Sequence, residues 1–365
     1  MFLNANINKL IVHDIDLKRW AMVKQKEVNL ENFKASVQWL RKFKKSNRIV
    51  SRKITKLITQ VSYNNEGIYQ DSQLFVKNNK DLFESSKCSH IFNTDQSGFN
   101  MEMHSGRTLE IKGTKAIERK VQSISSTTHS YTIQPTIAAD GTLLSPLFIV
   151  LQESGGVFGP IVKKNLFDAR NVYVAPSKSG KLSKELLKEW FNNIYFTNTP
   201  DNSILFVDSW TAYNKQDDLL IMKPQHKTIK ILQIPPKTTC LIQPLDVYFF
   251  RMWKNFVIRF SDRVILDSLN VNLYQRNNII KLQSLVYFQF SAARFKPFIK
   301  YSWYKCGYLT ERPEKFQTPV EFCFDSINDT ECVCHDCLEG QFILCSWCEK
   351  LLCFHHFFEE YHYCN

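Results

Sequence analysis

The tail of the chain, residues 332–364, most constrains what the chain can fold into. It reads CVCHDCLEGQFILCSWCEKLLCFHHFFEEYHYC and contains four cysteine and histidine pairs at metal-ligand spacing. The pairs are Cys334 with Cys337, Cys345 with Cys348, Cys353 with His356, and His362 with Cys364. Four such pairs provide enough ligands for two tetrahedral Zn²⁺ sites. A segment of about 35 residues is too short to be stable by its core alone, so bound metal would supply its folding free energy.

We therefore predict a small zinc-binding domain over residues 323–365, with one or two structural Zn²⁺ ions. If alternate pairs interleave, Cys334, Cys337, Cys353 and His356 share one ion, and Cys345, Cys348, His362 and Cys364 share the other. The order of pairing stays open, and Cys332 and His355 are possible substitutes in the ligand set. The alternative interpretation is a group of buried free cysteines with histidines on the surface.

The placement of the cysteines indicates a reducing environment. Of the 11 cysteines, eight fall between Cys323 and Cys364. A secreted disulfide protein would spread its pairs through the fold, whereas clustering with paired spacing is typical of an intracellular metal site. The first 15 residues lack the pattern of a signal peptide, and no run of 18 apolar residues predicts a membrane span. We expect no membrane partner.

Composition narrows the class of partner. The chain has 365 residues, 44% of them hydrophobic, and a formal net charge of +12. This composition is globular, with room for two or three domains, and its basic balance favours an anionic partner. Glycine is scarce, at 11 residues, and neither glycine-rich phosphate-binding motif occurs. We therefore expect no nucleotide cofactor.

The N-terminal residues 1–62 read as short basic helices. Phe33, Val37, Leu40 and Phe43 fall near helical spacing, and no acid occurs from residue 41 to residue 56. The basic residues of that stretch are Arg41, Lys42, Lys44, Lys45, Arg48, Arg52, Lys53 and Lys56. The pattern fits a helix-turn-helix domain that contacts DNA phosphates. The alternative is a solvated helical face. The polar stretch that follows predicts a linker over residues 63–88.

Residues 89–262 alternate strand-like and helix-like segments. Strands are predicted within 90–99, 129–141, 142–152, 203–210 and 228–236, and helices over 183–196 and 246–260. Asp140-Gly141 is a strong hairpin signal between two of the strands. This order predicts a mixed α/β sheet with helices packed against it. Residues 263–322 are apolar and partly helical, and we expect a helical extension that packs on the catalytic domain.

Three aspartates stand out in this region. Asp95 and Asp208 each end an apolar strand, and Asp246 lies at the start of a predicted helix inside the apolar run 234–250. Strand ends that meet at one sheet edge are usual ligand sites. Three acids without matched cations repel one another, and two Mg²⁺ or Mn²⁺ ions would offset that repulsion. A pair of such ions is also the usual arrangement for phosphodiester cleavage. The alternative is that each aspartate caps a turn or a helix.

Five segments together resemble a known catalytic domain. They are NTDQSGF, RTLEIKG, PTIAADGTLLSPLFIV, ILFVDSW and IPPKTTCLIQPLDVYFFRMWK, within residues 90–260. They resemble DDE-superfamily transposases of the pogo-type branch of the mariner group. The resemblance implies a ribonuclease-H-like fold with Asp95, Asp208 and Asp246 as its three metal-binding acids. Many relatives have Asn after the second acid and a His shortly downstream, whereas Ser209 and Trp210 follow here and His226 is the next histidine.

The two ends of the chain resemble the same group of proteins. Residues 32–53 resemble a CENP-B-type helix-turn-helix, which is expected to be incomplete because relatives carry a second one upstream. The tail resembles the Cys-rich C-terminal domain of certain nematode-type transposases. Together these resemblances imply a multidomain, cut-and-paste DNA transposase of the nucleus. It would act as a homodimer on double-stranded DNA, at element ends and target. The alternative is a domesticated or inactive transposase-derived DNA-binding protein.

Overall fold

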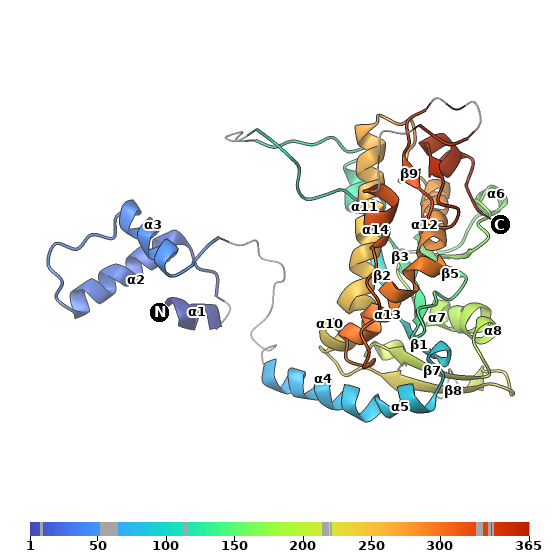
Figure 1. The fold of residues 1–365 in the computed structure, drawn as a ribbon, viewed down its shortest axis with the longest axis horizontal. Coiled ribbons are helices and arrows are strands. Elements are labelled where there is room, and N and C mark those ends of the chain that lie inside the picture. Colours follow the sequence, from blue (N-terminus) through green and yellow to red (C-terminus); the bar gives the residue numbers. More distant parts are fainter. Residues whose placement is uncertain are drawn as a thin grey trace. The chain divides into compact units, whose positions relative to one another are not determined.

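The computed structural model describes the chain except residues 8–9, 52–64, 112–115, 214–218, 220, 326–330, 335–336, 338 and 365. The chain divides into two compact units, Met1–Tyr63 and Asn64–Asn365 (Figure 1), which are described separately. Among the described residues, no helix has the length and apolar character needed to cross a membrane.

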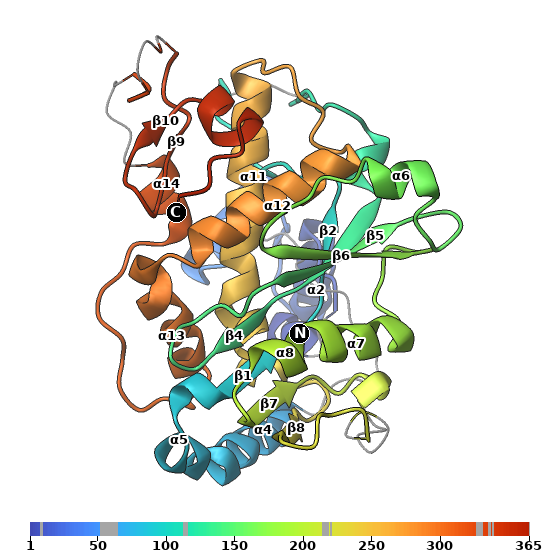
Figure 2. The same ribbon diagram turned by 90° about the vertical axis from the view of Figure 1, so that its right-hand side faces the viewer.

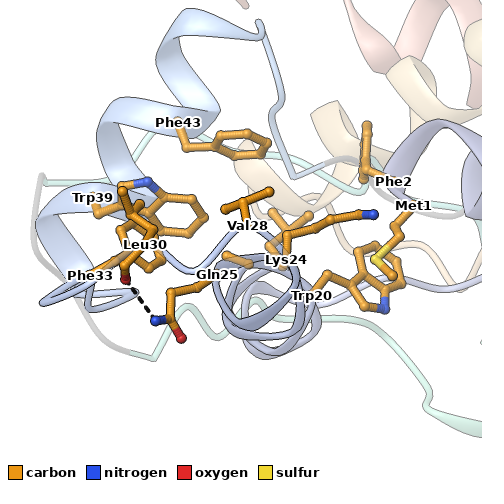
Figure 3. A pocket seen from close by; sticks show the side chains of 12 residues that line it. Met1, Phe2, Trp20, Lys24, Gln25, Val28, Leu30, Phe33, Trp39 and Phe43 are labelled. Carbon is orange, nitrogen blue, oxygen red and sulfur yellow. Dashed lines mark hydrogen bonds between the residues drawn. The ribbon is translucent and has the colours of Figure 1, made fainter.

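The described residues of the first unit form three helices: α1 (Phe2–Ile7), α2 (Asp14–Glu27) and α3 (Val37–Ser46). The helix predicted around residues 33–43 begins at Val37, because the Oγ of Ser36 accepts a hydrogen bond from the main-chain N–H of Trp39 at 3.1 Å and caps it. The ring of Trp39 stacks on Phe43 with centroids 5.2 Å apart. These rings and the apolar face of α2 line a cavity of about 370 Å³ (Figure 3).

The second unit is built on two four-stranded sheets. One sheet has the order β4-β1-β7-β8 and the other the order β2-β3-β5-β6. The strands are β1 (Ile91–Thr94), β2 (Ser97–Asn100), β3 (Ser130–Gln134), β4 (Thr136–Ala138), β5 (Leu147–Gln152), β6 (Val172–Ser177), β7 (Asn202–Val207) and β8 (Thr228–Gln233). β1, β7 and β8 run parallel, while β4 is antiparallel to β1. The predicted mixed α/β architecture is therefore observed.

The two sheets are joined through β1–β2 and β3–β4, which are two runs of chain that each contribute to both sheets. The residue pairs of β1 with β4 and those of β2 with β3 keep one register across the point where the sheets join. Asp95 therefore falls opposite Pro135. Proline has no N–H to donate to the ladder. The pairing is interrupted there, and the Oγ1 of Thr94 donates to the Pro135 carbonyl at 3.0 Å instead. The interruption separates Asp95 from the strand pairing.

The predicted turn at residues 140–141 connects β4 to the segment before β5. The main-chain N–H of Thr142 donates to Oδ1 of Asp140 at 2.9 Å. Gly141 has a φ of +90°, and a Cβ at this position would lie 2.5 Å from the carbonyl oxygen of Lys296. Glycine is required there both by the backbone conformation and by the close approach of the neighbouring helix.

Alternate strand residues face two separate apolar layers. In β5, Leu147 and Ile149 belong to a cluster with the C-terminal helices, whereas Phe148 and Val150 belong to the cluster of α7 (Lys184–Trp190). The period of two follows from strand geometry, and burial on both faces explains the continuous apolar run LFIVL. Figure 2 shows α12 (Arg276–Phe290) on one side of β5 and β6 and α7 on the other.

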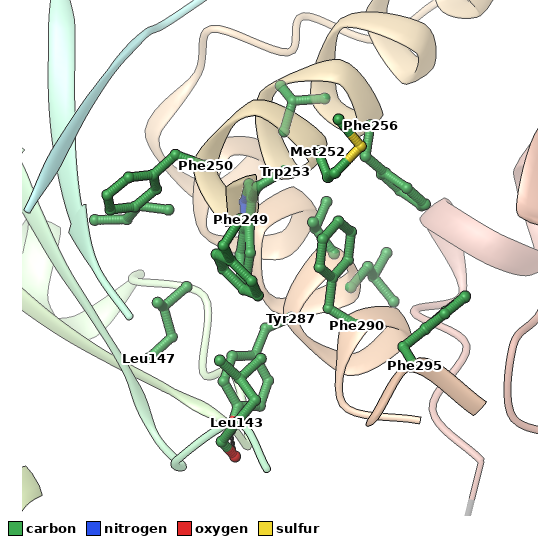
Figure 4. Packing of buried hydrophobic residues seen from close by; sticks show 14 of the residues in the cluster. Leu143, Leu147, Phe249, Phe250, Met252, Trp253, Phe256, Tyr287, Phe290 and Phe295 are labelled. Carbon is green, nitrogen blue, oxygen red and sulfur yellow. Dashed lines mark hydrogen bonds between the residues drawn. The ribbon is translucent and has the colours of Figure 1, made fainter. Parts of the chain in front are cut away.

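In the described part of the chain after residue 249, the longer helices are α11 (Phe250–Leu266), α12 (Arg276–Phe290) and α13 (Lys296–Lys305), and the short α14 (Pro319–Phe324) follows them. Helices occupy much of residues 263–322, where a helical extension was predicted, and the proposed boundary at residue 262 falls inside α11. Phe249, Trp253 and Phe290 form a fully buried aromatic layer between α11 and α12 (Figure 4). α12 also contacts the sheet directly, since the Nε2 of Gln283 donates to the hydroxyl of Tyr131 at 2.6 Å.

The predicted linker over residues 63–88 is instead largely helical. α4 (Asn65–Asn79) and α5 (Asp81–Ser85) belong to the second unit. Val76 is buried, and the ring of Phe83 lies 5.4 Å from that of Tyr308 and 5.6 Å from that of Trp303. The polar residues 62–73 suggested a linker, but the apolar residues after them pack on the core and hold the segment in place.

The cysteine-rich tail shares the core of the second unit. Its short strands β9 (Ile343–Leu344) and β10 (Leu351–Leu352) pair antiparallel. Phe342 and Phe358 pack on Phe260 of α11 with ring centroids 5.0 and 5.5 Å away. The tail is therefore not an isolated module, because its aromatic residues cover one end of α11.

Candidate metal centres and nucleic-acid interface

Asp95 and Asp208 lie side by side at one edge of the sheet. β1 and β7 are parallel neighbours, with Asn93 opposite Phe206 as the last main-chain pair. Each aspartate follows two residues later, so the same register brings them level with each other. Parallel strands direct their C-terminal ends to a common edge.

Asp246 reaches the same edge from a helical turn. The strand β8 ends at Gln233, two prolines follow, and α10 (Thr239–Ile242) leads into a π-helical turn over Leu245–Phe249 that runs into α11. Pro244 precedes the turn, where a missing N–H costs nothing. Asp246 is therefore in the first turn, as its sequence position predicted, and its neighbours Leu245 and Phe249 are fully buried.

The three carboxyl groups influence one another electrostatically. Desolvation and the charges of Asp246 and Asp208 raise the pKa of Asp95 well above its usual range, against a hydrogen bond from the N–H of Gln96 at 2.8 Å. Desolvation also raises the pKa of Asp246, with a further contribution from the charge of Asp208. Burial raises the pKa of Asp208, although the N–H of Trp210 donates to its Oδ1 at 3.2 Å.

Burial is the largest cause of the raised pKa in all three carboxyls, and the charges of neighbouring aspartates add to it for Asp95 and Asp246. Hard divalent cations prefer carboxylate oxygens, so the donor set fits Mg²⁺ or Mn²⁺. The three side chains are spread more widely than a single tight ligand group. Within the described part of the chain, the groups whose ligand atoms all lie within 4.8 Å of one another are the two Cys/His groups of the tail.

Two residues beside the aspartates were not predicted from the sequence. Lys254 is half-buried on α11, where desolvation lowers its pKa and the charges of Asp246 and Asp95 oppose that shift. Its position eight residues after Asp246, near two turns along the helix, is the signal that would have found it. Gln243 is fully buried, and its side chain opposes the rise in the pKa of Asp95.

The histidine downstream of the second aspartate lies elsewhere. His226 Nε2 is 3.8 Å from Oδ1 of Asp201, which precedes β7, and both side chains are exposed. Asp208 follows the opposite end of that strand. His226 therefore does not join the three aspartates.

The tail contains two tight groups of metal-ligand type. The first brings together Cys332, Cys337, Cys353 and His356, and the second brings together Cys345, Cys348, His362 and Cys364. In the second group, Nε2 of His362 lies 3.0 Å from Sγ of Cys364 and 3.4 Å from Sγ of Cys348. The groups follow the interleaved order, in which alternate pairs along the chain share a site.

One predicted ligand differs from the structure. Cys332 takes the place expected for Cys334 in the first group, and its Sγ lies 3.4 Å from Nδ1 of His356. The main-chain N–H of Cys332 donates to the carbonyl of Glu339 at 3.0 Å, which fixes it beside the other ligands. Spacing alone favoured the pair of Cys334 and Cys337, because it does not show which of two cysteines two residues apart points inward.

Residues outside the second group also orient it. Gln289 of α12 is fully buried, and its Oε1 accepts from the N–H of Ser346 at 2.7 Å. Its Nε2 lies 3.7 Å from Sγ of Cys345, as an N–H···S donor would. Desolvation lowers the pKa of His362, which favours the neutral imidazole that binds metal. Two sets of three thiols and one imidazole fit tetrahedral Zn²⁺.

The basic stretch of the first unit is described as far as residue 51. Arg41, Lys42, Lys45 and Arg48 are exposed. Lys44 is half-buried, and its Nζ donates to Oδ1 of Asp14 at 2.8 Å. The other three predicted DNA contacts, Arg52, Lys53 and Lys56, lie outside the described residues. These four exposed cations lie on or beside α3, and their contact with DNA phosphates stays a prediction.

Comparisons with known proteins bear mainly on the tail. Residues 303–364 match the family model described as the Tc5 transposase C-terminal domain. A comparison with curated proteins found no match for the chain. Similar solved structures include the Mos1 transposase paired-end complex with left transposon end, at 10% identity and a TM-score of 0.40, covering 82% of this chain and 80% of that one. A pre-cleavage Mos1 transpososome has 8% identity and a TM-score of 0.41, covering 84% of this chain and 80% of that one.

Proposed function

We propose that the chain is a metal-dependent DNA transposase of the mariner and Tc1 type, with a ribonuclease-H-like catalytic domain. The observation that carries the proposal is the meeting of Asp95, Asp208 and Asp246 at one sheet edge, where each carboxyl has a raised pKa. The match of residues 303–364 to the C-terminal domain of Tc5 transposase supports the same class. The nucleus and a homodimer on double-stranded DNA follow as parts of the proposal.

The three aspartates would hold two Mg²⁺ or Mn²⁺ ions, Asp95 and Asp208 sharing both and Asp246 completing one. When bound, such ions lower the pKa of the attacking water and stabilise the leaving oxygen of a phosphodiester. Hydrolysis breaks a P–O3′ bond and leaves a 3′-hydroxyl and a 5′-phosphate. In strand transfer, that 3′-hydroxyl attacks a target phosphodiester, and the 3′-oxygen of the target strand leaves.

Other residues of the chain have supporting roles in this reaction. Lys254, half-buried beside Asp95 and Asp246, is placed to neutralise part of their charge or to contact a DNA phosphate. The exposed side chains of Arg41, Lys42, Lys45 and Arg48 would bind the DNA backbone. The two Cys/His groups would hold structural Zn²⁺, and the tail would then support α11 through Phe260.

The test uses the purified chain, Mn²⁺ and DNA that carries the ends of the element. Wild type should nick the DNA, and Asp246→Ala should lower the nicking rate by at least about 10³-fold, because a metal ligand acts with the others as a unit. Asp201→Ala, which changes an exposed aspartate at the other end of β7, should leave the rate within about twofold. Equal nicking by Asp246→Ala would exclude the three-aspartate site.

The same preparation distinguishes the alternative function. A domesticated DNA-binding protein would bind the DNA with a strong salt dependence, since phosphate contacts release counterions, but wild type would not nick it. Metal analysis of the chain should give two Zn²⁺ per molecule, falling to one in Cys345→Ser. A content of zero in wild type would exclude structural zinc.

A further inference from the structure

Asn93 lies between the three chain segments that carry the predicted catalytic aspartates. It is the third residue of β1, is 0% exposed, and precedes Asp95 by two residues. Asparagine is depleted in strand interiors, and a buried amide without partners is costly. The amide of Asn93 therefore needs both an acceptor and a donor in its surroundings.

Both ends of the amide are used, and on different segments. Nδ2 of Asn93 donates to the main-chain carbonyl of Phe206 at 3.0 Å. Its Oδ1 accepts from the main-chain N–H of Leu245 at 3.1 Å. Phe206 precedes Asp208 by two residues, and Leu245 immediately precedes Asp246. One side chain thus connects β1, β7 and the π-helical turn, in each case within two residues of an aspartate.

These contacts occur where the regular backbone no longer fixes the geometry. The main-chain pairing of β1 with β7 ends at Asn93 and Phe206, so both aspartates lie just beyond it. The N–H of Leu245 is in the first turn of its helix and has no acceptor within that helix. The Asn93 amide supplies that acceptor and continues the connection between the strands by one further hydrogen bond.

We propose that Asn93 is a positioning residue that fixes the relative placement of Asp95, Asp208 and Asp246 for divalent cations. The inference rests on the proposed function, because it takes these aspartates as the metal ligands. Carboxylates that repel one another move apart unless the scaffold holds them. Removing such an outer partner of metal ligands typically lowers metal affinity by about 10–100-fold.

The test measures Mn²⁺ affinity directly, by the loss of the free Mn²⁺ electron paramagnetic resonance signal during titration of the full chain. Asn93→Ala should bind Mn²⁺ about 10-fold more weakly than wild type or worse. The Mn²⁺ concentration for half-maximal nicking should rise in parallel, and saturating Mn²⁺ should recover much of the rate. Asn93→Ser, which retains one hydrogen-bonding group, should fall between the two and serves if Asn93→Ala does not fold.

Asn171→Ala is the matched control. Asn171 is also buried, at 3% exposed, and joins the start of β6 to α12 by donating from Nδ2 to the carbonyl of Ser284 at 3.1 Å. It should lose comparable stability and keep wild-type Mn²⁺ affinity. If Asn93→Ala and Asn93→Ser bind Mn²⁺ as tightly as wild type, the positioning role is wrong. If Asp208→Ala also binds it as tightly, the proposed metal site itself is wrong.

Discussion

Two clusters of carboxylates lie along α11, and they differ in the hydrogen-bond donors and cations that surround them. Asp246 precedes the helix and faces Asp95 and Asp208, and all three carboxyls have a raised pKa. Near the other end, Asp262 is joined by His104 to Glu102 of the segment after β2. Sixteen residues of helix, at about 1.5 Å per residue, place the two clusters roughly 24 Å apart.

Both carboxylates of the second cluster receive hydrogen bonds from the protein itself. His104 lies between two carboxylates, with Nε2 2.6 Å from Glu102 and Nδ1 3.0 Å from Asp262. Glu102 is buried and also accepts from the main-chain N–H groups of Gln122 and Ser123. Although desolvation opposes it, hydrogen bonds from His104 and Ser105 lower the pKa of Asp262.

The difference teaches how to separate a structural acid cluster from one suited to a cation. Around Glu102, every carboxylate has donors, and the cluster ties the base of the segment between β2 and β3 to α11. Around Asp95, Lys254 is the nearby cation that the structure describes, and its own pKa is lowered by desolvation. The arrangement around Glu102 stabilises the fold, whereas the three aspartates are desolvated and Asp95 and Asp246 are also repelled by their neighbours, both of which a bound cation would offset.

Removal of Glu102 should give the largest effect on stability. Glu102→Ala leaves His104 and two main-chain N–H groups without their acceptor, so we expect a loss of about 3–5 kcal/mol in the free energy of unfolding. Denaturant unfolding measures it. Glu110→Ala changes a partly exposed ion pair with Arg119 and should cost at most about 1 kcal/mol. Equal losses in the two variants would mean that the buried cluster is not structural.

Mn²⁺ should raise the free energy of unfolding only by binding at Asp95, Asp208 and Asp246, so it separates the two clusters further. At 100 times its dissociation constant, a ligand that binds the folded state alone adds about 2.7 kcal/mol. We expect that gain in wild type and in Asp201→Ala, and little of it in Asp208→Ala, when thermal unfolding is followed with and without Mn²⁺. A full gain in Asp208→Ala would place the cation elsewhere.

Without Mn²⁺, the same carboxyls should make stability depend on pH. Their pKa in the folded state is raised above the unfolded value of about 3.9. The folded state therefore binds more protons in the window from about pH 4 to the raised pKa, and stability falls as pH rises through it. Asp95→Asn should lessen this fall. If the variant loses stability with pH as steeply as wild type, Asp95 does not contribute.

His104 should give the smallest effect, in a different pH window. Its hydrogen bonds to Asp262 and Glu102 raise its pKa above the unfolded value of about 6.5. Its contribution is complete below that value and is lost as pH rises through the folded pKa. Charged hydrogen bonds contribute about 1.5–3 kcal/mol, so His104→Gln should lose about 2 kcal/mol at pH 6 and less at pH 9. If the loss does not depend on pH, the protonated form of His104 is not the source of the stability.

The sequence predicted the main elements because their patterns are local. Apolar runs ending at Asp95 and Asp208 and the turn at Gly141 correspond to elements of the structure. The predicted linker over 63–88 was wrong, because Val76 and Phe83 become informative only through the rings that they contact. Spacing also favoured Cys334 over Cys332. Either cysteine fits the pattern, and only the path of the folded backbone decides which of them points toward the other ligands.

The sequence by itself determined the chemical kinds of group that this protein presents: three aspartates at element ends, eight cysteines and several histidines near the tail, and a basic N-terminal stretch. Only the tertiary structure decided which of them meet. Asn93 bonds to Phe206 and Leu245, which are 113 and 152 residues away in the chain. Side-chain hydrogen bonds over such separations leave no periodic trace in the sequence, because they depend on strand register and helix placement rather than on neighbouring residues.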